Sequence, residues 1–105
     1  MEKEYIIKKN EDIATLVGKK KRLYSDNYIV YYYKHERFKL AVSVSKKLGK
    51  ANIRNYEKRV VKEILRPLVK QMPSYQMLIV VREKALESEF LAKKEDLLGL
   101  IKKIR

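Results

Sequence analysis

The sequence predicts an α+β fold in which helices pack on a small, mostly antiparallel sheet, with the elements in the order α-β-β-(β)-α-β-α. Two stretches, 28–33 and 75–81, are rich in β-branched and aromatic side chains, as strands are. Residues 38–45 alternate between apolar and small or polar side chains, which indicates a half-buried strand. Residues 53–68 carry apolar side chains every three or four positions, which predicts an amphipathic helix.

The first helix is expected to begin at Asn10, because asparagine caps helices and the two acids after it suit the positive end of the helix dipole. Gly18 can end this helix. Its apolar stripe consists of Ile13, Leu16 and Val17. The run 19–22 follows as a basic loop, and residues 34–37 are predicted to form a hairpin connection between the two strands beside them.

Alternation over residues 38–45 assigns each side chain to one face of the sheet. The side chains expected on the core face are Phe38, Leu40, Val42 and Val44. Those expected on the opposite face are Lys39, Ala41, Ser43 and Ser45. Because that face is small and polar, it leaves room for a ligand to lie against the sheet.

The long helix and the last helix each have a predicted core face. That of the long helix comprises Ile53, Tyr56, Val60, Val61, Ile64, Leu65 and Leu68. Because Pro67 lacks an amide hydrogen, the helix must kink or stop near Arg66. The last helix begins at Ser88 or Glu89. Its apolar side is expected to contain Phe90, Leu97, Leu98, Ile101 and Ile104.

The composition restricts the class of partner. The 105-residue chain has the length of one domain, and its 26 Lys and Arg against 13 Asp and Glu give a net charge of +13. Such a charge favours a polyanion as partner. The longest apolar runs, 28–33 and 77–81, fall far below the roughly 20 residues of a membrane-spanning helix. No cysteine and no signal-type stretch occur, which fits a reducing, cytoplasmic setting. We expect a nucleic acid rather than a membrane or a small-molecule substrate.

A cationic ridge on the long helix is the main candidate for phosphate contacts. Arg54, Lys58 and Lys62 are spaced four apart on one side of the helix. The residues that flank or extend this ridge are Lys46, Lys47, Lys50, Arg59 and Arg66, and only Glu57 and Glu63 offset it. A lysine-rich solvated surface is the alternative. The mixture with arginine, which binds phosphate with two hydrogen bonds, favours RNA.

Residues 43–59 read SVSKKLGKANIRNYEKR. This stretch resembles the signature of the bacterial ribonuclease P protein subunit, S-V-S-K-K-x-G-x-A-V-x-R-N-x-x-K-R. The resemblance extends to residues 7–12, to the strand at 28–31 and to residues 75–82 with Ala85. It therefore covers nearly the whole chain, and we expect residues 1–105 to form a single RNA-binding domain.

The resemblance implies a left-handed βαβ crossover and two RNA surfaces. The chain is then the protein component of an endoribonuclease that removes the 5′ leader of precursor tRNA. The RNA subunit carries catalysis and its Mg²⁺ ions, so the protein has no catalytic residue and no metal of its own. The helix after Gly49 is implied to contact the catalytic RNA. Its matching residues are Arg54, Asn55, Lys58, Arg59 and Lys62, to which the cationic ridge adds Lys50 and Arg66.

The second implied surface is a cleft for the leader, between the first helix and the sheet. The positions that match the family are Tyr31, Ser45, Lys46 and Lys47, and Ser43 shares their small face. Tyr31 can stack on a base. Two first-helix positions, Ile13 and Val17, are aliphatic where the family has aromatics. A third departure is Tyr56, where the family commonly has arginine.

No hydrolytic site can be assembled from the sequence. The single histidine, His35, falls in the predicted hairpin connection. The adjacent acid pairs Glu11–Asp12 and Glu95–Asp96 fit helix surfaces rather than the clustered carboxylates of a metal-dependent nuclease. Two alternatives are a ribosomal-protein-like RNA-binding module, which shares the same electrostatics, and a stand-alone nuclease, which the lack of a carboxylate cluster disfavours.

Overall fold

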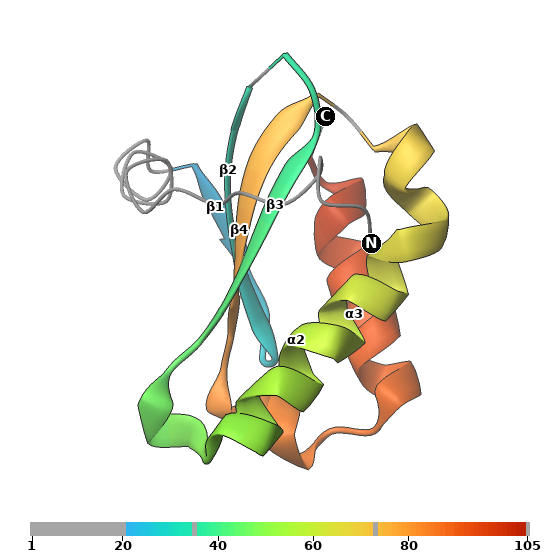
Figure 1. Cartoon of the computed structure of the whole chain (residues 1–105). Coiled ribbons are helices and arrows are strands. Elements are labelled where there is room, and N and C mark those ends of the chain that lie inside the picture. Colours follow the sequence, from blue (N-terminus) through green and yellow to red (C-terminus); the bar gives the residue numbers. More distant parts are fainter. Residues whose placement is uncertain (1–20, 35, 73, 105) are drawn as a thin grey trace.

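The computed structural model describes residues 21–34, 36–72 and 74–104. The strands are β1 (Arg22–Tyr24), β2 (Tyr28–Lys34), β3 (Lys39–Val44) and β4 (Tyr75–Val81), and the helices are α2 (Ala51–Leu65) and α3 (Phe90–Lys102). Short 3₁₀ helices occupy η2 (Lys46–Leu48), η3 (Arg66–Gln71) and η4 (Glu83–Glu87). Both α-helices pack on the same side of the sheet (Figure 1). The predicted α+β class is confirmed, while the predicted first helix and His35 lie outside the described residues.

The sheet has the strand order β1-β2-β4-β3. β2 pairs antiparallel with both β1 and β4, whereas β3 pairs parallel with β4. The predicted hairpin between β2 and β3 is therefore wrong, because β4 lies between them. The reason is apolarity: five of the seven residues of β4 are buried, so this strand takes a central position. β3, α2 and β4 form a βαβ unit, whose left-handed sense stays a prediction from the family resemblance.

β1 is the optional third strand of the predicted order. It begins at Arg22, so the predicted basic loop 19–22 is wrong at its last residue. Arg22 pairs with Tyr31 and Leu23 with Val30, and this pairing extends the sheet by one short edge strand. Pairing with β2 satisfies backbone groups that a loop would leave to water.

The core lies between the sheet and the two helices. As predicted, Phe38, Leu40 and Val44 are buried and Val42 packs against them. α2 contributes Val60, Val61, Ile64 and Leu65, and α3 contributes Leu97, Leu100 and Ile101, with Ile104 just beyond it. α2 ends at Leu65 and η3 follows with Pro67 in its first turn, as the proline predicts. α3 begins at Phe90 with Glu89 as its N-cap residue, in agreement with the predicted start.

Three predicted core residues are wrong. Ile53, Tyr56 and Phe90 are 40%, 51% and 43% exposed. The buried residues of α2 begin only at Glu57, and those of α3 begin only at Lys93. Both helices therefore start beyond the edge of the core. Their first apolar side chains have the predicted helical phase, but they lie beyond the residues that form the core.

Candidate nucleic-acid interface

The cationic ridge lies on the outer side of α2. Lys50 is the N-cap residue of this helix, and Arg66 follows its last residue. Lys50, Asn55, Arg59 and Arg66 are exposed, and Arg54, Lys58 and Lys62 are partly exposed. The structure thus brings all of the residues predicted to contact catalytic RNA onto one helix and its two ends.

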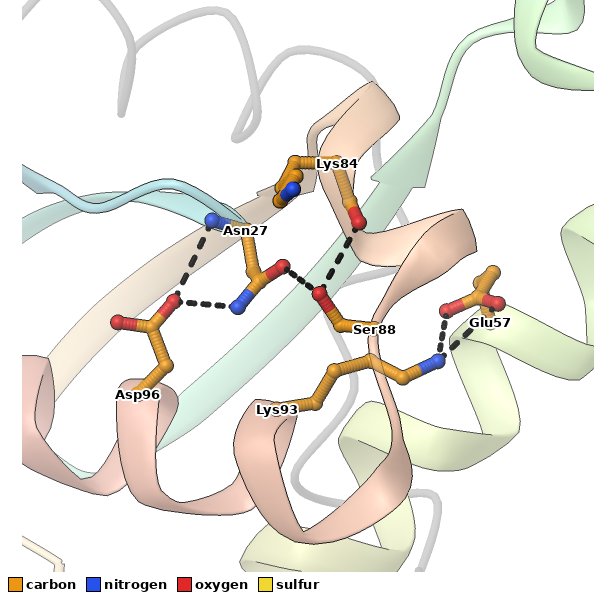
Figure 2. Close-up of polar contacts among 6 residues, drawn as sticks. All are labelled: Asn27, Glu57, Lys84, Ser88, Lys93 and Asp96. Atoms are coloured by element: carbon orange, nitrogen blue, oxygen red, sulfur yellow. Dashed lines mark hydrogen bonds and ion pairs between the residues drawn. The ribbon is translucent and has the colours of Figure 1, made fainter.

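The acids near the ridge neutralise it less than the sequence suggests. Glu57 was expected on the polar face, but it is 3% exposed and points toward α3. Both of its carboxylate oxygens accept hydrogen bonds from Lys93 Nζ, at 3.1 and 3.3 Å (Figure 2). Glu63 forms an exposed pair with Arg66 at 2.9 Å, which is a weak interaction in water. Glu63 is therefore the one acid of α2 left at the surface beside the cations.

Arg54 holds a distinctive position on this ridge. Its Nε atom is buried and has no hydrogen-bond partner among the described residues. Buried polar atoms of folded proteins are rarely left unpaired. An oxygen acceptor outside the described part of the chain is the kind of group that satisfies such a donor.

Gly49 permits η2 to pack against the start of α2. A methyl group on its Cα would lie 3.1 Å from the Cδ1 and Cγ2 atoms of Ile53. This distance is shorter than ordinary van der Waals contact. Glycine at this position therefore brings Lys46 and Lys47, which lie in η2, close to the first turn of the cationic helix.

The predicted leader cleft corresponds to the sheet face opposite the helices. Tyr31 and Ala41 flank Leu78 in one row across this face, and Ser43 pairs with Val80 in the next row. Ala41 and Leu78 are buried, and Tyr31 and Val80 pack against them. The face is therefore more apolar than the predicted small and polar surface, because β4 inserts between β2 and β3.

The polar end of this face lies where β3 ends. Ser45 caps η2 by accepting a hydrogen bond from the Lys47 backbone N–H at 3.2 Å. Ser43, Ser45, Lys46 and Lys47 are all exposed. Ile13 and Val17, the other two residues predicted for the cleft, lie outside the described residues.

Two further residues of the same face were missed by sequence reasoning. Arg22 lies beside Tyr31, and Tyr24 lies beside Ile29 at the edge of the sheet. Tyr24 is 66% exposed, and the Arg22 guanidinium carbon lies 6.0 Å from the centre of its ring. The available signal was the short apolar-polar alternation of residues 22–24, which becomes a strand only when paired with β2.

Asp96 has a structural role rather than a position on an open helix surface. Its Oδ2 atom accepts hydrogen bonds from Ser25 Oγ at 2.6 Å and from Asn27 Nδ2 at 2.8 Å. Ser88 Oγ donates to Asn27 Oδ1 at 2.7 Å, which extends the network (Figure 2). The carboxylate thus ties the turn between β1 and β2 to α3. No group of three or more His, Cys, Asp or Glu that could hold a metal ion occurs within the described part of the chain.

Tyr28 is fully buried in the core. Burial raises the pKa of its hydroxyl far above the ordinary value of 10, and the nearby charges of Glu57 and Asp96 raise the pKa further. The hydroxyl makes no hydrogen bond to any residue that the structure describes. Tyr28 therefore stays neutral at physiological pH and serves the core rather than proton transfer.

A mixed sheet covered on one side by two helices, together with a cationic helix that carries few exposed acids, defines a small basic protein that associates with a polyanion. No helix in the described ranges is long and apolar enough to span a bilayer. The whole chain, residues 1–105, matches the family model described as Ribonuclease P. The chain belongs to the ribonuclease P protein family, which confirms the resemblance seen in residues 43–59.

Individual relatives agree with this assignment. The ribonuclease P protein component of Mycoplasma mobile is 35% identical over 104 residues, covering 99% of this chain and 93% of the relative. The solved ribonuclease P protein of Staphylococcus aureus has a TM-score of 0.88 at 29% identity, with 93% of each chain covered. That of Thermotoga maritima has a TM-score of 0.86 at 28% identity, covering 94% of this chain and 96% of its own. The protein is thus a subunit of a ribonucleoprotein endoribonuclease, which implies an RNA partner and tRNA 5′ processing.

Proposed function

We propose that α2 binds the catalytic RNA of ribonuclease P and that the sheet face opposite α2 and α3 binds the 5′ leader of precursor tRNA. The cationic ridge of α2 carries this proposal, because it runs from Lys50 to Arg66 with Glu57 turned into the core. In this reading the protein assists removal of the leader and leaves the chemistry to the RNA.

The contacts to the catalytic RNA follow from the shape of the ridge. A regular helix rises about 1.5 Å per residue, so Arg54, Lys58 and Lys62 form a row about 12 Å long. Such a row suits successive phosphates of an RNA backbone. Arg54 is partly exposed, so its side chain can take part in this row. Asn55 and Arg59 are exposed on the next line of the helix and extend the same surface.

The leader contacts are supported by the sheet face. Tyr31 packs beside the Ala41–Leu78 cluster, which orients its ring on the face away from the helices. Stacking of one base on an aromatic ring contributes roughly 1–3 kcal/mol. Ser43 has a small side chain beside Val80, and Lys46 and Lys47 follow at the end of the strand. A single strand that crosses the sheet from β2 toward the end of β3 would therefore meet first the Tyr31 ring and then two cations.

In this proposal the RNA, and not the protein, holds the Mg²⁺ ions. Metal-assisted phosphodiester hydrolysis needs ions held by clustered oxygen ligands. The protein then contributes charge, because its cations lower the repulsion between catalytic RNA and precursor tRNA. This contribution is greatest when Mg²⁺ is scarce.

The test is cleavage of a 5′-labelled precursor tRNA at low Mg²⁺ by the protein alone, by a mycoplasma ribonuclease P RNA alone and by the two together. We expect only the mixture to cut at the mature 5′ end. Arg54→Ala and Lys58→Ala should raise the Mg²⁺ concentration needed, whereas Lys94→Ala, an exposed cation of α3, should leave it unchanged. A protein that binds this RNA but adds nothing to cleavage would favour the ribosomal-protein-like alternative, and cleavage by the protein alone would favour a stand-alone nuclease.

A further inference from the structure

Exposed apolar side chains lie at the start of α2, on the flank of the helix next to Arg59. Tyr56 and Ile53 are 51% and 40% exposed, and both belong to the first two turns of the helix rather than to a loop tip. They line a hollow of about 440 Å³ together with Leu48, Asn52, Leu86 and the buried Glu57, whose carboxylate pairs with Lys93. Neither packing within the described core nor a phosphate contact explains these two side chains.

We propose that Tyr56 is a stacking platform for an unpaired base of the RNA partner, with Ile53 and the adjoining hollow receiving the edge of that base. The inference rests on the proposed binding of catalytic RNA by α2 and names a contact of that surface.

The charges around Tyr56 favour a nucleotide over other apolar occupants. Arg59 lies one helical turn further on, where i and i+3 side chains are neighbours. Lys50 caps the same end of the helix, and Asn52 offers an amide that can hydrogen-bond to a base edge. A second copy of the chain is disfavoured, because each copy carries a net charge of +13.

The ring of Tyr56 is held in place by a buried lysine of α3. Lys93 Nζ lies over it at 5.5 Å from the ring centre, within range of a cation–π interaction. Lys93 is fixed in turn by both carboxylate oxygens of Glu57 (Figure 2). Because this ion pair is buried, its geometry does not depend on solvent. The ring is therefore oriented before RNA arrives, which lowers the entropy cost of stacking.

The experiment measures binding of the full chain to a mycoplasma ribonuclease P RNA transcript over a range of salt concentrations. Tyr56→Ala should weaken binding at least about fivefold, since a stacked base contributes roughly 1–3 kcal/mol. It should leave the salt dependence unchanged, because no phosphate contact is lost. Tyr56→Phe should bind like the wild type. Arg59→Ala should instead reduce the slope of log K against log salt by about 1.

Two controls separate stacking from loss of structure. Leu91→Ala removes another exposed apolar side chain, 67% exposed and outside the hollow, and should not change binding. Tyr56→Leu keeps apolar volume and helix propensity without a ring, and should be weakened like Tyr56→Ala. A photo-crosslinking residue at position 56 should react with an unpaired nucleotide of the transcript.

Tyr56→Ala and Tyr56→Leu binding the transcript as tightly as the wild type would overturn the stacking proposal and leave the proposed function standing. A crosslink to paired nucleotides only, or an effect of these variants on self-association alone, would also overturn it. If the wild-type chain itself does not bind the transcript while folded, the proposed function fails and the stacking proposal falls with it.

Discussion

Glu57 and Lys93 form a charged pair inside the protein, with side chains only 4% exposed. Burial of either charge alone is costly in free energy. Each ion compensates for the other because the Lys93 ammonium donates hydrogen bonds to both carboxylate oxygens of Glu57. Helical periodicity gave no sign of this pair. It placed Glu57 beside the cations of α2, and only the docking of α3 supplies the lysine that allows a carboxylate to face the core.

Removing one member of the pair should therefore be strongly destabilising. We expect Lys93→Met to lower the free energy of unfolding by about 3–5 kcal/mol, because Glu57 is then buried without a partner. The double variant Glu57→Leu with Lys93→Met should recover much of this loss. Urea denaturation measures both, with Lys94→Met as the matched exposed control. Equal stability of Lys93→Met and the control would contradict the pairing.

Tyr28 gives a prediction at alkaline pH. Its pKa is raised by burial above the ordinary value of 10, so the folded protein retains a proton that the unfolded chain loses above that pH. The unfolding free energy should therefore fall as pH rises beyond about 10. In Tyr28→Phe this fall should be smaller by the share of one tyrosine, and below pH 9 the variant should be at least as stable as the wild type. Chemical denaturation at pH 7 to 11 tests the difference. Identical pH profiles of the two proteins would exclude Tyr28 as the source.

At the scale of elements, sequence patterns predicted which way side chains point on a helix better than how much of the helix the core covers. The phase of α2 is right, because Val60, Val61 and Ile64 are buried as expected. The same phase assigned Ile53 and Tyr56 to the core, although the core covers α2 only from Glu57 onward. A periodic pattern states which way a side chain points, but the length of the partner layer depends on how distant elements dock. The exposed residues of α2 that result are those of the proposed base-stacking platform.

The turn between β1 and β2 is likewise fixed by a distant element. We expect Asp96→Ala to lower the free energy of unfolding by roughly 2 kcal/mol or more, because Ser25 and Asn27 lose a charged acceptor. Amide exchange at Asn27, whose N–H lies 3.3 Å from Asp96 Oδ2, should also accelerate. Glu95→Ala is the control, since Glu95 is an exposed neighbour on the same helix. Unchanged exchange at Asn27 in Asp96→Ala would show that the turn does not depend on α3.

At the scale of the whole molecule, the sequence predicted the layers but not the strand order. Alternation in residues 38–45 assigned Leu40 and Val44 to the core correctly. It contains no information on which strand lies next to β3, and chain order alone suggests β2 rather than β4. The family resemblance identified the candidate site residues, which composition alone could not select among 26 basic side chains. Their contacts with RNA stay predictions.

The charge of the whole molecule makes RNA binding strongly dependent on salt. Each lysine or arginine that neutralises a phosphate releases counterions and contributes about 1 to the slope of log K against log salt. We expect Lys58→Ala to reduce that slope by about 1 for the catalytic RNA, and Lys102→Ala, on the far end of α3, to leave it unchanged. Filter binding between 50 and 300 mM salt measures both. Equal slopes for the two variants would mean that RNA binding depends on the total charge and not on a defined cationic surface.

The position of β4 between β2 and β3 has a consequence for how the chain acquires its fold. β2 and β3 share no backbone hydrogen bonds in the sheet, so neither can close on the other as it is synthesised. β2 can pair with β1, but β3 joins the same sheet only through residues 75–81, which follow the whole of α2. Non-local pairing of this kind slows folding. The cationic helix is thus synthesised before the central strand that joins β3 to the rest of the sheet.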